Sequence, residues 1–323
     1  MAADSEYRRS GVNLDSTSTG LNIGRQVRVT SIGFAPGKAL ADVLSIVDAE
    51  GGLGCDLIVL PETFLGQTDD SMESLDGPSV TGLSALASKY GTYIVCPVDR
   101  MENGRRLNTA VLLDRRGAIA GCYNKVFPYW SEFRHSRVVE PGWDSSVFKT
   151  DFGQLGIAIC FDVNFPEVWA RMADQNAELV AWPSAYSAGS TLQAHALIHH
   201  FYIVTSTYHP DCAVYDINGR EILYEVGASV NVTRTRLDLD RCIFHTNFNM
   251  GKLGQLLCDH PDDIELEEEQ VREQWFILRA KRPGISAREL ARHYGLEELR
   301  AYIGRSRAEI DAMRSLSVSN AVH

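Results

Sequence analysis

Three side chains that could cooperate in covalent catalysis stand at the ends of predicted strands. Cys160 ends an apolar run just before a sharp turn into a helix, Glu62 follows the apolar run 57–60, and Lys125 ends a predicted hairpin. A thiol attacks a carbonyl or nitrile carbon as the thiolate, for which it needs a base and a nearby cation. If the three side chains converge on one sheet edge, they can hydrolyse a carbon–nitrogen bond.

Each of these residues also has an ordinary structural alternative. A cysteine that ends an apolar strand is often a small core residue, Glu62 could cap a helix or lie in solvent, and Lys125 could be a surface lysine. Glu62 follows four apolar residues and Pro61, where a charge is costly unless it is paired or faces a pocket. In the catalytic interpretation, Glu62 is the general base and the Lys125 ammonium stabilises the thiolate and the oxyanion.

The elements that must position these residues alternate between strand and helix from residue 26 to about residue 240. This rhythm indicates a single mixed α/β domain. The predicted strands are 26–33, 57–60, 92–98, 108–114, 118–124, 147–150, 154–160, 178–182, 201–207, 212–216, 221–224 and 230–237. The predicted helices are 38–48, 78–90, 166–176 and 190–200.

Three segments of the chain resemble, in the same order, the signature of the nitrilase superfamily of carbon–nitrogen hydrolases. Residues 57–63 resemble its apolar strand with Pro-Glu, 123–125 its Tyr-x-Lys, and 156–167 its Gly-x-x-x-Cys-x-Asp-x-x-x-Pro-Glu segment. Asn108-Thr109-Ala110 and Pro141-Gly142 fit the intervening pattern. The resemblance covers about residues 27–240, and it implies an α/β fold, the four-layer αββα sandwich of the nitrilase type.

The resemblance also implies roles for individual residues. Cys160 is the nucleophile, Glu62 the base and Lys125 the cation beside the oxyanion. The family often uses a second glutamate that orients the lysine and the substrate. Glu132 is the best matching position for it, and Glu140 is the competing candidate.

Further residues are expected around the substrate. The backbone NH of Phe161 would complete the oxyanion site, and Tyr129 and Trp182 are expected to line the pocket. Asp162 and Asn164 are expected to shape the turn rather than to react.

The predicted function is that of a cysteine hydrolase of nonpeptide carbon–nitrogen bonds, which acts on an amide or N-carbamoyl substrate through a thioester and releases ammonia or an amine. Typical nitrilases carry Trp-Glu after the cysteine, whereas Phe161-Asp162 resembles the amidase and carbamoyl-amidase branches. Two alternatives stay open: a nitrilase that acts on a nitrile, and a nitrilase-like binding or regulatory protein without significant turnover. Because residues 195–200 and 205–211 depart from the family pattern, the substrate is not identified.

No metal and no cofactor are predicted. His195 and His199 are spaced to share one helix face, but no glutamate accompanies them as in zinc-protease helices. The proposed chemistry needs only the thiol, the base, the lysine and water.

Composition restricts the possible partners. A formal charge of −11 over 323 residues argues against broad binding to nucleic acid or to anionic membranes. The seven cysteines include no Cys-x-x-Cys pair, and no long apolar run suggests a signal peptide or a membrane span, so a cytoplasmic protein with reduced thiols is predicted. The family resemblance implies a homodimer or a larger homo-oligomer.

Three regions are predicted along the chain. They are a flexible N-terminal segment (1–24), the carbon–nitrogen hydrolase domain (25–245) and a helical C-terminal extension (246–323). In the extension, an acidic linker at 259–270 precedes helices within 271–314. Ser286 and Glu289 form a capping-box pattern that could open a helix-turn-helix, although packing on a subunit or partner is favoured over DNA binding.

Overall fold

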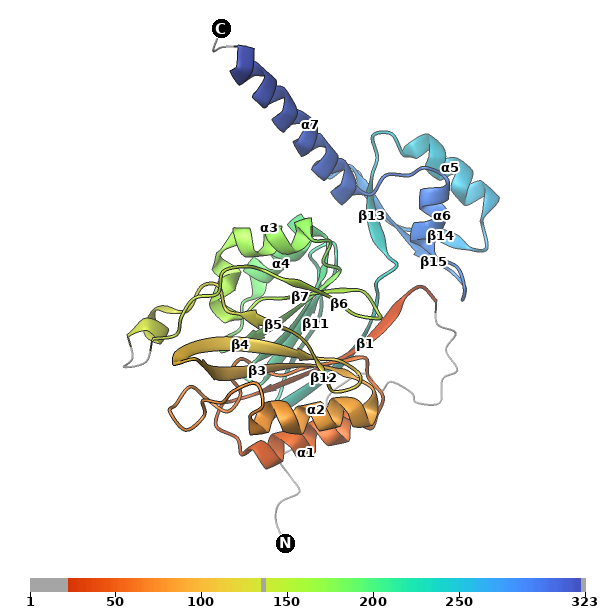
Figure 1. Cartoon of the computed structure of the whole chain (residues 1–323). Coiled ribbons are helices and arrows are strands. Elements are labelled where there is room, and N and C mark those ends of the chain that lie inside the picture. The colour runs from red at the N-terminus through yellow and green to blue at the C-terminus, as the bar shows by residue number, and fades with distance from the viewer. Residues whose placement is uncertain (1–22, 135–137, 321–323) are drawn as a thin grey trace. The chain divides into compact units, whose positions relative to one another are not determined.

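The computed structural model describes residues 23–134 and 138–320, and it confirms the predicted four-layer αββα sandwich (Figure 1). Residues 27–237 form this sandwich, whereas residues 23–26 and 238–320 form a second compact unit. The predicted hydrolase domain, 25–245, includes the first eight residues of this second unit's longer segment. Nearly all of the predicted flexible segment 1–24 lies outside the described residues.

Two six-stranded sheets form the inner layers of the sandwich. Sheet A has the order β12-β1-β2-β3-β4-β5 and sheet B the order β11-β10-β9-β8-β7-β6. The strands of sheet A are β1 (Gln26–Phe34), β2 (Leu57–Val59), β3 (Tyr93–Glu102), β4 (Arg105–Leu113), β5 (Ile119–Asn124) and β12 (Val230–Asp238). The strands of sheet B are β6 (Val147–Lys149), β7 (Gln154–Ile157), β8 (Leu179–Ser184), β9 (Tyr202–Thr207), β10 (Asp211–Tyr215) and β11 (Glu221–Val226).

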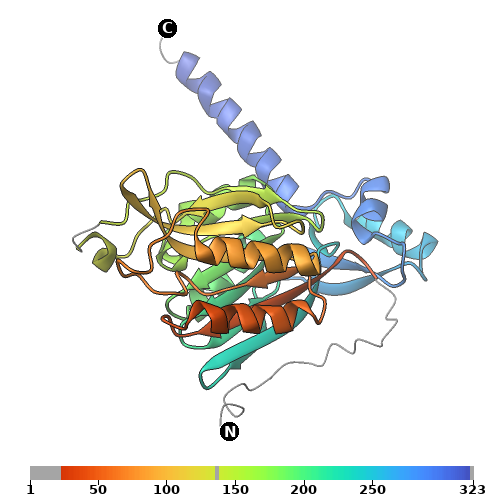
Figure 2. The ribbon, with the colours of Figure 1, turned by 60° about the horizontal axis from the view of Figure 1, so that its bottom comes forward.

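Helices form the two outer layers. The helices α1 (Leu40–Gly51) and α2 (Pro78–Tyr90) cover sheet A, and α3 (Pro166–Asp174) and α4 (Gly189–His199) cover sheet B (Figure 1). Figure 2 shows α1 and α2 side by side across the outer face of sheet A. The apolar residues of α2 that face the core are spaced i, i+3 and i+7, and Gly91 ends the helix with a left-handed φ of 58°.

The second unit contains strands where the sequence predicted a linker and helices. Its sheet has the order β13-β15-β14, with β13 (Cys242–His245), β14 (Ile264–Gln270) and β15 (Trp275–Ala280). Its helices are α5 (Met250–Asp259), α6 (Ala287–His293) and α7 (Leu299–Asn320).

The predictions of an acidic linker at 259–270 and of helix from residue 271 are thus wrong. The short apolar run in β15 is buried at the centre of the sheet, and such runs do not distinguish a strand from a helix by periodicity. The glutamates of β14 lie on an edge strand, where Glu265 pairs with Arg279 and Glu267 with Arg241. The predicted capping of α6 is confirmed, because the Ser286 hydroxyl accepts a hydrogen bond from the backbone NH of Glu289 at 3.0 Å.

None of the helices in the described parts of the chain combines the length and the apolar character that a membrane crossing requires.

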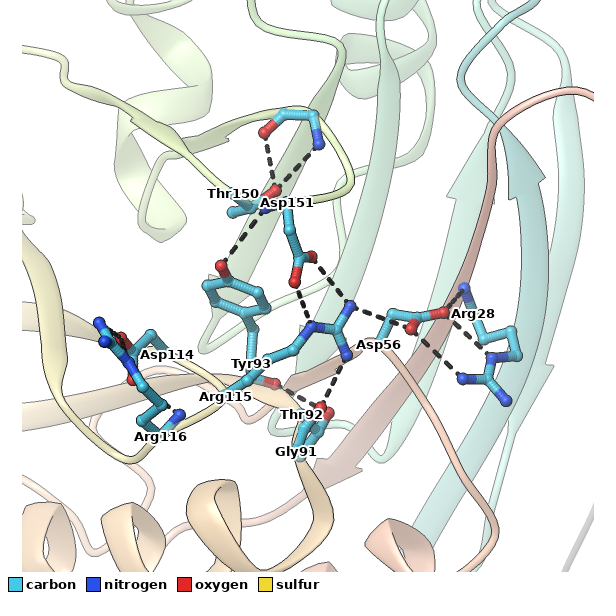
Figure 3. A network of polar contacts seen from close by, with 11 residues as sticks. Arg28, Asp56, Gly91, Thr92, Tyr93, Asp114, Arg115, Arg116, Thr150 and Asp151 are labelled. Carbon is cyan, nitrogen blue, oxygen red and sulfur yellow. Dashed lines mark hydrogen bonds and ion pairs between the residues drawn. The ribbon is translucent and has the colours of Figure 1, made fainter.

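A polar network links the two sheets of the sandwich (Figure 3). Arg115, in the turn between β4 and β5, donates to Asp56 at 3.1 Å, to Asp151 at 2.6 Å and to the carbonyl oxygen of Gly91 at 2.7 Å. Asp151 lies in the turn between β6 and β7, so this guanidinium connects sheet A with sheet B. Burial alone would raise the pKa of Asp56, but hydrogen bonds from Arg28 and Arg115 lower it below its ordinary value.

We expect Arg115→Met to lower the free energy of unfolding by about 2 kcal/mol, because charged hydrogen bonds to Asp56 and Asp151 are lost while most of the apolar stem is retained. Urea denaturation of both proteins measures this difference. Arg116→Met is the matched control, since that side chain is 85% exposed and pairs with Asp114, and we expect a change within about 0.5 kcal/mol. Equal losses in the two variants would contradict a linking role for Arg115.

Candidate active site

Glu62, Lys125 and Cys160 line one pocket of about 510 Å³. Glu62 follows β2 and Lys125 directly follows β5, both in sheet A, whereas Cys160 lies beyond β7 of sheet B. The expected convergence is therefore found, but it is not at a single sheet edge. The face-to-face packing of the two sheets brings their strand ends together.

The Lys125 ammonium lies between two carboxylates. Its Nζ donates to Glu62 Oε1 and to Glu132 Oε2, each at 2.7 Å, and all three side chains are buried. Burial alone would lower the pKa of Lys125, but Glu62 and Glu132 raise it above its ordinary value. Burial likewise would raise the pKa of Glu132, and Lys125 outweighs that effect and lowers it. The lysine is held charged and Glu132 is held ionised.

Of the two candidates for the second glutamate, the structure places Glu132 beside Lys125. Glu132 belongs to the short 3₁₀ helix η1 (Trp130–Phe133), and its Oε2 also accepts from the backbone NH of Tyr129 at 2.6 Å. The side chain of Glu140 is 45% exposed and lies 3.8 Å from Arg105, outside the pocket lining.

Two amide side chains that the sequence did not predict as site residues complete this cluster. Asn108 Nδ2 donates to Glu62 Oε1 at 2.7 Å and to Glu132 Oε1 at 3.0 Å, and Gln67 Nε2 donates to Glu132 Oε1 at 2.9 Å. Asn108 fitted the family pattern, and a fully buried asparagine within the apolar strand β4 was an available signal for its role. Gln67 lies in a loop and gave no such signal.

Cys160 occupies a strained turn. It has a φ of 47°, in the left-handed region that residues other than glycine rarely adopt. It begins the short 3₁₀ helix η2 (Cys160–Asn164), which precedes α3, and β7 ends at Ile157. The predicted strand 154–160 is thus three residues too long, because the chain leaves the sheet before it reaches the thiol.

The side chain of Asp162 holds this turn together. Its Oδ2 accepts from the backbone NH of Ile159 at 2.9 Å and from the Tyr123 hydroxyl at 2.7 Å, and its Oδ1 accepts from the backbone NH of Phe127 at 2.8 Å. Complete burial raises the pKa of Asp162 to about 6, although these three donors oppose the rise. Asp162 is thus positioned to shape the turn, as predicted.

Two buried indoles fix the backbone of the same turn. Trp182 Nε1 donates to the carbonyl oxygen of Cys160 and Trp169 Nε1 to that of Asp162, each at 3.1 Å. Trp182 was predicted to bind substrate, but it is fully buried and is not among the described residues that line the pocket. Its indole is instead used to position the nucleophile backbone.

The remaining lining of the pocket includes the predicted Tyr129 and Phe161. The aromatic rings of these two residues are in edge-to-face contact, with centroids 5.2 Å apart. Further residues complete the lining: Gln67, Ser131, Asn164, Ala185 and Tyr186.

The thiol of Cys160 is buried among these groups. Burial raises its pKa most strongly and the Glu62 carboxylate adds to the rise, while Lys125 opposes it. The pKa remains above its ordinary value, so the thiol is protonated at neutral pH.

The histidines of α4 serve packing in this structure. His195 lies 2.8 Å from the carbonyl oxygen of Val163 through Nε2, and its ring stacks on Trp169 with centroids 4.4 Å apart. Within residues 23–134 and 138–320, no three His, Cys, Asp or Glu side chains come together as a set that could hold a metal ion.

The sequence was compared with known families and proteins. Residues 33–242 match the model of a family described as carbon-nitrogen hydrolase. An omega-amidase of Danio rerio is 27% identical over 155 residues, which cover 44% of this chain and 56% of the relative. An omega-amidase of Mus musculus is 23% identical over 280 residues, which cover 80% of this chain and 94% of the relative. The chain thus spans little more than half of the first relative's length and nearly all of the second's.

Solved structures are similar to this fold at low sequence identity. An amidase from Nesterenkonia sp. has a TM-score of 0.59 and 22% identity, with 69% of this chain and 94% of that chain covered. A nitrilase-superfamily member from Saccharomyces cerevisiae has a TM-score of 0.57 and 21% identity, with 67% of this chain and 91% of that chain covered. At these identities the likeness shows the αββα fold alone.

Proposed function

Because the chain belongs to the nitrilase superfamily of carbon–nitrogen hydrolases, we propose that it hydrolyses small nonpeptide amides or N-carbamoyl compounds through a thioester on Cys160. The observation that carries this proposal is the buried Lys125 ammonium between Glu62 and Glu132, in the same pocket as the thiol. A buried charge cluster of this kind costs free energy, and a pocket without chemistry has no need for it. This favours an enzyme over a nitrilase-like binding protein.

In the proposed first half-reaction, Glu62 takes the proton of the Cys160 thiol as the sulfur attacks the carbonyl carbon. The raised pKa of the thiol means that its deprotonation accompanies the attack. The oxyanion of the tetrahedral intermediate is stabilised by the Lys125 ammonium and by the backbone NH of Phe161. The carbon–nitrogen bond then breaks, Glu62 returns the proton to the leaving nitrogen, and ammonia or an amine departs.

In the second half-reaction, Glu62 takes a proton from water and the resulting hydroxide attacks the thioester carbon. Collapse of this second intermediate breaks the carbon–sulfur bond and releases the carboxylic acid. The proton on Glu62 returns to the sulfur, which restores the thiol. In this sequence Glu132 holds Lys125 in place, and Asn108 holds both carboxylates.

Amides are favoured over nitriles for two reasons. Phe161-Asp162 follows the nucleophile where typical nitrilases have Trp-Glu, and several relatives are amidases. A panel of amides, N-carbamoyl compounds and nitriles tests the proposal, with ammonia release and the mass of the acyl-enzyme as readouts. Turnover of nitriles alone would support the nitrilase alternative, and no turnover of any compound would support the binding-protein alternative.

The homo-oligomer predicted from the family resemblance is also part of this proposal. Light scattering coupled to size-exclusion chromatography measures the number of subunits. Since β15 is the central strand of the second unit's sheet, deletion of residues 271–323 would destroy that sheet. A truncation after residue 298, which removes α7 alone, is the cleaner test of whether the C-terminal end is needed for assembly.

The pH dependence of turnover should report on the turn that carries the nucleophile. We expect the acid limb of kcat/KM to contain an ionisation near pH 6, because the Asp162 carboxylate that accepts the three hydrogen bonds is lost below its pKa of about 6. Tyr123→Phe removes a donor that lowers this pKa, so the limb should move to higher pH. A limb at the same pH in both proteins would show that Asp162 does not contribute to it.

A further inference from the structure

The proposed pocket has an excess of negative charge. Glu62 and Glu132 contribute two carboxylates, Lys125 contributes one ammonium, and the Cys160 thiol is neutral. Lys125 is the single cationic side chain among the described residues that line the pocket, and both carboxylates already hold it at 2.7 Å. A second anion in this pocket would therefore meet net repulsion and, among the described lining residues, no dedicated cation.

The neighbouring arginine is directed to an aromatic ring instead of the pocket. The guanidinium of Arg134 lies over the ring of Trp130, 5.3 Å from its centroid, and Arg134 is absent from the described pocket lining. The remaining polar groups of the described lining are uncharged: the side chains of Gln67, Ser131 and Asn164 and the hydroxyls of Tyr129 and Tyr186. Gln67 is committed to Glu132 through its Nε2.

Aromatic rings form the apolar part of the pocket wall. Phe161 contacts the ring of Tyr129 edge-to-face at 5.2 Å and the ring of Phe165 at 5.4 Å, and Phe165 stacks on Phe127 at 3.6 Å. Tyr186 lines the pocket as well, and it packs against the buried Trp182 at 5.7 Å. The rings support one another and therefore present a preformed apolar surface to a ligand.

From the excess negative charge of the pocket and its aromatic wall, we infer that the acyl group of the substrate is uncharged and carries an alkyl or aryl chain. Amides with a carboxylate in the acyl group are then poor substrates. This inference rests on the proposed amidase function.

Matched pairs of amides test the inference on the full-length protein. Succinamide and succinamate are nearly equal in size and differ by one negative charge, and 3-(4-carbamoylphenyl)propionamide and 3-(4-carboxyphenyl)propionamide differ in the same way. We expect kcat/KM to be at least about tenfold higher for the neutral member of each pair. We also expect this ratio to fall as salt is raised, because screening weakens the repulsion. Higher kcat/KM for the carboxylates would overturn the inference while leaving the amidase function intact.

A pair of variants locates the effect in the pocket. Ser131→Lys adds a cation to the lining, and Ser131→Met adds a chain of similar length without charge. The ratio of succinamate to succinamide turnover should rise several-fold in the lysine variant relative to the methionine variant. Equal ratios in the two variants would contradict an electrostatic origin. Loss of all amide turnover in the wild type is a different result, because it overturns the proposed function itself.

Discussion

Replacement of Cys160 by alanine should reduce ammonia release from any amide substrate by at least about 10³-fold, because it removes the nucleophile of the proposed thioester mechanism. Intact-mass spectrometry of the wild type during turnover should show the added acyl group, and the variant should show none. The change removes a small side chain that is 5% exposed, so the fold should persist. Circular dichroism and the urea midpoint check this expectation.

Cys96→Ala is the matched control for the loss of a buried thiol. Cys96 is fully buried in the core that β3 shares with α1 and α2, and burial raises its pKa as it does for Cys160. We expect the control to lose about 1 kcal/mol of stability through the small cavity and to retain kcat. If Cys160→Ala kept the turnover of the control, a thioester mechanism on Cys160 would be excluded.

Lys125→Met should affect both activity and stability. It removes the cation proposed to stabilise the oxyanion, which should lower kcat by about 10² to 10³-fold. It also leaves Glu62 and Glu132 buried without their partner, which should lower the free energy of unfolding by about 3 to 5 kcal/mol. The stability loss should be larger at pH 8 than at pH 5. Burial raises the pKa of Glu132 once Lys125 no longer lowers it, so the folded variant loses stability as the pH rises through that pKa.

The triple variant Lys125→Met, Glu62→Gln, Glu132→Gln separates the two effects. Because it replaces the buried charges by neutral groups of similar size, we expect it to recover most of the stability that the single variant loses. It should not recover turnover, since base and cation are both absent. A triple variant that is as unstable as the single variant would show that the loss does not come from unpaired carboxylates.

Local sequence determined most of the sandwich. The strand β1, the helix α2 and the β4–β5 hairpin lie close to where their periodicity and turn residues predict them. In these segments the spacing of apolar residues along the chain shows which face is buried, so the secondary structure can be predicted from local sequence. The order of Glu62, Lys125 and Cys160 along the chain was equally readable, because each ends a short apolar segment.

Tertiary packing determined several features that the sequence pattern did not specify. The sequence favoured Glu132 over Glu140 but did not exclude Glu140, and in the structure Glu132 of η1 contacts Lys125 whereas Glu140 lies near Arg105. The sequence did not determine which face of β8 carries the Trp182 side chain. In the structure its indole NH donates to the carbonyl oxygen of Cys160. The strands β14 and β15 were not predicted, because neither the acidic sequence of β14 nor the short apolar run of β15 has a periodicity that distinguishes a strand from other structures. Sequence alone specifies which reactive groups exist. The distances that let one lysine bind two carboxylates arise when sheet A and η1 fold, and the thiol of Cys160 joins them only when sheet B packs on sheet A.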